Sequence, residues 1–79
     1  MVIISSAGNT AAPAYLVLKS KGYELFRDAS NPNLWIAQKG KNKFIAESTV
    51  ELLGLILIYE SRGENWMAND KEIEEFLSK

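Results

Sequence analysis

Hydrophobic positions recur with helical spacing near the start of the chain, alternate in the middle, and return to helical spacing at the end. Before the first periodic segment, the apolar run VIIS at residues 2–5 suits either a short strand or an apolar arm. From Thr10, a suitable N-cap residue, apolar side chains follow every three or four positions until Gly22, which suits the left-handed residue after a helix. This spacing predicts a helix over residues 11–21.

Three short segments with strand-like patterns follow. The first, YELFRDA, alternates its side chains between two faces, and the SNPN after it has the composition of a turn. The other two, LWIAQ and KFIAE, flank KGKN, in which Gly40 and Asn42 suit positive φ, so they predict a β-hairpin with a loop of about four residues. The predicted strands cover residues 23–29, 34–38 and 43–47.

A long apolar run then returns to helical signals. Ser48 and Glu51 form an S-x-x-E capping box directly before VELLGLILIYE, and Gly63 follows the run, so we expect a helix over residues 49–61. Because this run is apolar on nearly every side, we expect it to be the most buried element. Gly54 within it suits the close approach of another backbone.

The last segment is a short amphipathic helix, with Ile73, Phe76 and Leu77 at positions i, i+3 and i+4. Together these elements predict a single α+β domain over residues 1–79. We expect a three- or four-stranded, mainly antiparallel sheet, packed on one face by two helices, with the C-terminal helix added. The expected order is an optional strand, a helix, three strands, a helix and a helix.

Strict alternation along the predicted strands gives the sheet two faces, and we expect the two main helices to cover one of them. That face displays Tyr23, Leu25, Leu34, Ile36, Phe44 and Ala46. The other face displays Phe26, Trp35, Ala37 and Ile45 within a rim of charged residues. Aromatic anchors inside a polar rim are typical of protein interfaces, so Phe26, Trp35 and Ile45 are the candidate interface residues. The alternative, with equal weight, is that the C-terminal segment folds over this face.

Charge is nearly balanced, with a formal net charge of −1, but it is unevenly distributed. Residues 1–43 carry six basic and two acidic side chains, a net charge of +4. Residues 44–79 carry three basic and eight acidic side chains, a net charge of −5. Such asymmetry either orients a partner or is neutralised where the two halves of the fold face each other.

The basic half includes Lys39, Lys41 and Lys43, which surround the predicted hairpin loop. Lysines that contact phosphates beside an aromatic ring such as Trp35 are a combination used by proteins that bind single-stranded nucleic acid. We favour a solvated turn, because loops are usually polar and exposed. Nucleic-acid binding through these lysines is kept as the alternative function.

The order helix, three strands, helix is similar to that of the double-stranded RNA-binding domain, a family that has lysines at the start of its second helix. In this chain the corresponding positions are Glu47, Ser48, Thr49, Val50 and Glu51. Two carboxylates there repel the phosphates that a helix N-terminus attracts. The resemblance is limited to the order of the elements.

The chain contains no histidine and no cysteine. The usual general base, the commonest metal ligand, the thiolate nucleophile and the disulfide are therefore all missing. Neither of the glycine-rich phosphate-binding patterns, GxxxxGK[ST] or GxGxxG, is present. We therefore expect no metal site, no cofactor and no enzyme activity.

The apolar runs are far shorter than the ~20 residues that span a bilayer, and MVII is too short for a signal peptide. We therefore expect a cytoplasmic protein that has no membrane partner. The sequence favours a small, non-catalytic binding or regulatory module that acts through protein–protein contacts, in the form of a homodimer or with another protein.

Overall fold

The computed structural model of the protein describes residues 1–6 and 8–79. Their elements, in chain order, are α1 (Ala11–Ser20), β1 (Glu24–Arg27), β2 (Trp35–Lys39), β3 (Asn42–Ala46), α2 (Thr49–Arg62), the 3₁₀ turn η1 (Gly63–Asn65) and α3 (Asp70–Leu77). The α+β class and the order of the elements are confirmed, and the sheet has three strands. Residues 2–5 form no helix or strand, so they are an arm.

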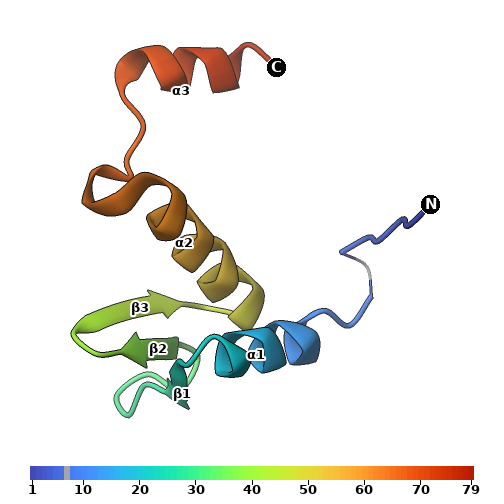
Figure 1. Ribbon diagram of the computed structural model, residues 1–79, viewed down its shortest axis with the longest axis vertical. Coiled ribbons are helices and arrows are strands. Elements are labelled where there is room, and N and C mark those ends of the chain that lie inside the picture. Colours follow the sequence, from blue (N-terminus) through green and yellow to red (C-terminus); the bar gives the residue numbers. More distant parts are fainter. Residues whose placement is uncertain (7) are drawn as a thin grey trace.

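The three strands form one antiparallel sheet with β2 between β1 and β3 (Figure 1). A turn of two residues, Gly40 and Lys41, joins β2 to β3 and is shorter than the predicted loop of four. Gly40 has a φ of 60°, whereas neither Lys41 nor Asn42 has a positive φ. This is the pattern of a type II′ turn, whose twist matches that of two antiparallel strands. The expected positive φ at Asn42 is wrong.

Both α1 and α2 pack on the same face of the sheet and enclose the core between them. The buried cluster consists of Leu18, Tyr23, Ala37, Leu52 and Ile56. Partly buried side chains surround it, namely Leu25, Trp35, Phe44, Ala46 and Leu53. The buried hydroxyl of Thr49 donates a hydrogen bond to the carbonyl of Ala11, with an oxygen–oxygen distance of 2.7 Å. The beginnings of the two helices are therefore joined by a satisfied polar contact.

The second helix, α2, is less buried than its apolar sequence suggests. Ser48 caps it as predicted, accepting a hydrogen bond from the backbone N–H of Glu51 at 3.1 Å. Its buried residues form one stripe, Thr49, Leu52 and Ile56. Its exposed apolar residues are Val50, Leu57 and Ile58. The expectation that this helix is the most buried element is wrong, since three of its fourteen residues are buried, against two of five in β2. A domain this small has too few elements to surround the helix.

The C-terminal helix, α3, stands apart from the sheet and α1 (Figure 1). The carboxylate of Glu72 accepts a hydrogen bond from the backbone N–H of Asn69 at 2.9 Å, and Arg62 of α2 binds the same carboxylate at 3.0 Å. Its apolar side chains Ile73 and Phe76 are exposed. The alternative in which the C-terminal segment folds over the free sheet face is therefore wrong.

We predict that Leu52→Ala lowers the free energy of unfolding by about 2–5 kcal/mol, because it leaves a cavity where a fully buried side chain joins both helices to the sheet. The matched control Leu57→Ala, on the exposed side of the same helix, changes it by less than about 1 kcal/mol. Urea titrations followed by far-ultraviolet circular dichroism measure both values. Equal losses would contradict this core.

Candidate protein-binding surface

The pairing of the strands decides which side chains share a face of the sheet. Phe26 on β1 lies opposite Ile36 on β2, which in turn lies opposite Ile45 on β3. Residues opposite each other on antiparallel strands project to the same side, so these three form a row. The neighbouring row is the one that packs under the helices, and it consists of Leu25, Ala37 and Phe44. The Phe26–Ile36–Ile45 row therefore points away from the helices, and we call this side the open face.

The open face displays apolar side chains to solvent at its two edges. Phe26 is 40% exposed and Ile45 is 50% exposed, whereas Ile36 between them is only 5% exposed. Ile36 lies on the middle strand, between Phe26 and Ile45 as its cross-strand neighbours. The face thus has a packed centre and two apolar edges without cover.

The expectation that Trp35 shares a face with Phe26 and Ile45 is wrong. Trp35 projects to the helix side, where its ring meets Tyr15 of α1 edge to face, with ring centroids 6.1 Å apart. The guanidinium carbon of Arg27 lies 4.1 Å from the centre of the Trp35 ring on the same side of the sheet. Trp35 therefore contributes to the packing between α1 and the sheet.

The same reversal applies along β2. Ala37, expected on the free face, is fully buried in the core, and Ile36, expected in the core, lies on the open face. Leu34, also expected in the core, lines the groove described below. The other predicted core residues, Tyr23, Leu25, Phe44 and Ala46, do lie on the helix side. The error is confined to Leu34 and β2, a segment that is apolar on both of its faces.

The three lysines of the hairpin do not form one basic patch. The ammonium of Lys39 donates a hydrogen bond to the carbonyl of Lys21, just after α1, at 2.8 Å. It also lies 5.4 Å from the centre of the Tyr23 ring. Lys41 is in the turn, and Lys43 projects from the open face, because it is two residues from Ile45 on the same strand. The structure brings these candidate nucleic-acid residues to three different surroundings.

Within residues 1–6 and 8–79, Tyr23 and Glu72 have shifted pKa values. Burial, followed by the carboxylate of Glu60, raises the pKa of the Tyr23 phenol above its ordinary value. The backbone hydrogen bond from Asn69, followed by the side chain of Arg62, lowers the pKa of Glu72. The phenol therefore stays neutral beside the Lys39 ammonium, and the Glu72 carboxylate stays ionised where α3 begins.

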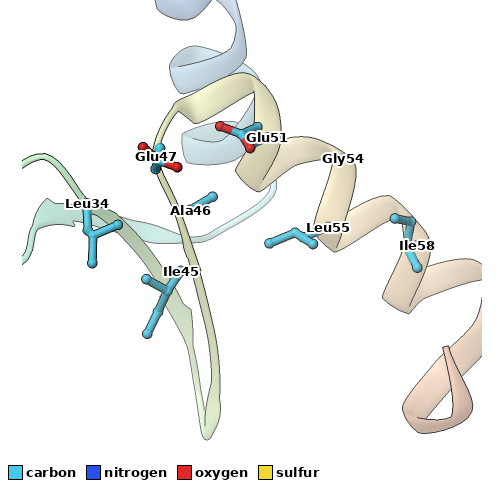
Figure 2. Close-up of a pocket in the computed structure, with 8 residues that line it drawn as sticks. All are labelled: Leu34, Ile45, Ala46, Glu47, Glu51, Gly54, Leu55 and Ile58. Carbon is cyan, nitrogen blue, oxygen red and sulfur yellow. The ribbon is translucent and has the colours of Figure 1, made fainter. Parts of the chain in front are cut away.

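A groove runs along the outer edge of β3, between this strand and α2 (Figure 2). Its lining consists of Leu34, Ile45, Ala46, Glu47, Glu51, Gly54, Leu55 and Ile58. Towards the hairpin turn it continues between Lys43, Phe44, Tyr59 and Trp66. Leu55 points from the helix toward Ala46 on the strand, so the walls of the groove are largely apolar (Figure 2).

Sequence reasoning did not find this groove. The available signal was the surplus of apolar residues in α2, because a helix that buries one stripe leaves residues such as Leu55 and Ile58 for another contact. The exposed carboxylates of Glu47 and Glu51 lie at one end of the groove, and Lys43 lies at the other. Apolar walls, charged ends and an edge strand suit the binding of polypeptide rather than of a small ion.

Among residues 1–6 and 8–79, no three acidic, histidine or cysteine side chains are grouped closely enough to hold a metal ion. None of the helices that these residues form has the length and apolar character needed to cross a membrane. No family model, curated protein or solved structure matches the chain. The proposals below therefore depend on the geometry of the protein itself.

We predict that Lys39→Gln lowers the free energy of unfolding by about 1 kcal/mol, because it removes a charged donor from the carbonyl end of α1. The matched controls Lys41→Gln and Lys43→Gln change it by less than about 0.5 kcal/mol. Urea denaturation compares the three variants. The same loss in all three would contradict the separate placement of the lysines.

We predict that α3 loses helicity on acidification because Glu72 stabilises its first turn only when ionised. The folded-state pKa of Glu72 lies below its ordinary value of 4.5, so the stabilisation is complete above that value and is lost as the pH falls through the lowered pKa. The Cα chemical shifts of α3 report its helicity. In the control variant Glu72→Ala, which has no side-chain acceptor, they should already show reduced helicity at neutral pH, and equal helicity in both proteins at neutral pH would contradict the capping role.

Proposed function

We propose that the protein is a small, non-catalytic binding or regulatory module that acts through protein–protein contacts, and that it associates with a second copy of itself. The observation that carries this proposal is the balance of its apolar side chains. Among the described residues, seven hydrophobic residues are buried, whereas sixteen large hydrophobic residues are exposed. Soluble monomers rarely leave extensive contiguous apolar surface in water, so this balance favours association.

The open face is the surface through which we propose the two copies meet. Phe26 and Ile45 extend from its two outer strands around the packed Ile36. Glu24 and Lys43, on the same face, carry opposite charges at opposite edges of the sheet. In a twofold symmetric pair each copy presents the same patch, so opposite charges at opposite edges can meet when the faces pack.

Nucleic-acid binding through the hairpin lysines receives less support. The ammonium of Lys39 donates a hydrogen bond to the carbonyl of Lys21, and Lys43 belongs to the proposed protein-binding face. A groove that binds a polyanion instead needs lysines that line the same surface. A cytoplasmic location is part of the proposal, because a chain without cysteine suits a reducing compartment.

We predict that the protein sediments as a dimer at micromolar concentration and that Phe26→Ser raises the dissociation constant at least about tenfold, because it removes an aromatic side chain from the interface. The control Trp35→Phe lowers stability through its contact with Tyr15 and leaves the dissociation constant unchanged. Sedimentation equilibrium measures the dissociation constants, and thermal unfolding measures stability.

Two results would contradict the proposed function. One is a wild-type protein with the mass of a single copy over the whole micromolar range. The other is a dimer whose dissociation constant responds to Trp35→Phe but not to Phe26→Ser, which would place the contact away from the open face.

A further inference from the structure

The groove between β3 and α2 has the form of a place for one more strand. α2 extends past β3 on the side away from β1 and β2 (Figure 1). Leu55 therefore points toward the edge of the sheet, and Ile58 lines the same groove, whereas Ile45 projects from the other side of β3 (Figure 2). An added strand beside β3 would lie beneath these helix residues and extend the sheet under α2.

The backbone of β3 is arranged to accept such a strand. Lys39 and Asn42 flank the two-residue turn and form its hydrogen-bonded pair. Hydrogen-bonded and non-bonded pairs alternate along antiparallel strands, so Phe44 and Ala46 also direct their backbone groups toward β2. The N–H and C=O groups of Lys43 and Ile45 consequently point to the open edge. In the described part of the chain β3 pairs only with β2, so this edge is free.

Gly54 is a second feature of the groove. No contact within the described chain explains why this helix position has no side chain. A glycine within a helix costs about 0.5–1 kcal/mol relative to alanine, and its lack of a side chain lets another backbone come close. Apart from Gly54 itself, its two chain neighbours and the nearby backbone of α2, no atom of the described chain lies within 4 Å of the position that a Cβ would take at Gly54. Because Gly54 lines the groove, the missing side chain leaves room for a backbone that approaches α2 from outside.

A strand in this place needs apolar side chains on both of its faces. Side chains on one face would meet Leu55 and Ile58, and those on the other would lie beside Ile45 on the open face. Strands buried on two sides have continuous apolar runs rather than alternating ones. The run Val2-Ile3-Ile4 in the N-terminal arm matches this requirement, and β-branched residues favour the strand conformation.

The arm has no partner of its own in the structure. Val2, Ile3 and Ile4 are each at least 80% exposed, and none of the side chains in residues 1–6 is charged. The arm also leads away from the body of the protein, on the far side of α1 from the sheet (Figure 1). Each chain therefore carries both a free strand-forming segment and a free strand-accepting groove.

We propose that the arm of one copy pairs with β3 of a second copy, as a fourth strand in the groove beneath α2. This inference rests on the proposed self-association and names the segment that each copy supplies. Exchange of identical segments readily gives a symmetric dimer, because each copy binds the arm of the other and the same contact forms twice. Backbone hydrogen bonds to Lys43 and Ile45 supply affinity, and the apolar walls select the arm.

Disulfide trapping tests the exchange directly, because the natural chain contains no cysteine. Single variants Ile3→Cys and Ile45→Cys are mixed in equal amounts and oxidised in air, with one variant labelled with ¹⁵N so that mass spectrometry identifies the mixed dimer. The control replaces Ile45→Cys with Glu24→Cys, which lies on the same face at the opposite edge of the sheet. We expect at least tenfold more mixed disulfide with Ile45→Cys than with Glu24→Cys.

The other outcomes separate the two proposals. A protein that dimerises but gives equal trapping at both positions would overturn the arm exchange and leave the proposed function standing. A protein that sediments as a single copy would overturn both. A disulfide formed within single chains of the double variant Ile3→Cys/Ile45→Cys would place the arm on its own sheet and overturn the exchange.

A second pair of variants tests the groove without touching either strand. Gly54→Leu fills the space beneath α2, so we expect it to reduce the mixed disulfide at least tenfold. The control Gly54→Ala adds only one methyl group where the chain leaves open space, and it should keep most of the trapping. Leucine and alanine both favour a helix more than glycine does, so unfolding of α2 does not explain a decrease in the mixed disulfide. Undiminished trapping in Gly54→Leu would overturn the assignment of the groove.

Discussion

The type II′ turn at Gly40 is the constraint on which the rest of the sheet depends. It places Lys39 opposite Asn42, and every later pair of the hairpin follows from this one. Ala37 and Phe44 thereby face the helices, and a slip of one residue in β3 would turn the opposite set of side chains toward the core. The positive φ of residue 40 favours glycine there, whereas an added side chain would meet no neighbouring atom. The requirement is therefore one of backbone conformation and not of space.

The elements of this fold were predictable because their signals are local. Caps, stop residues and the hairpin pattern depend on neighbouring positions, and they placed both main helices and all three strands within a few residues. The Ser48 cap, for example, forms where the sequence indicates it. The amphipathic C-terminal helix likewise begins at its capping residues Asn69 and Glu72.

The faces of the sheet were harder to predict because they depend on pairing between strands. In LWIAQ both alternating sets are apolar, so hydrophobicity alone does not assign Trp35 or Ile36 to a side. The hairpin register resolves this question, because Phe44 in the core requires Ala37 beside it and so turns Ile36 outward. The position of the groove beside β3 could not be predicted either, because it depends on the direction in which α2 leaves the sheet, and this direction is set by contacts between distant parts of the chain.

The two edge strands of the sheet differ in how many backbone groups they offer to an added strand. β1 has four residues and leads directly into a loop that is closed by a hydrogen bond from the N–H of Asp28 to the carbonyl of Leu34. Arg27 also donates to the carbonyl of Pro32, which holds the same loop against the strand. Short edge strands are one of the features by which natural proteins resist edge-to-edge aggregation. Because the β3 edge is one residue longer and has the groove beside it, an added strand is favoured there over the β1 edge, and equal growth from both edges, which a continuous β-fibre needs, is disfavoured.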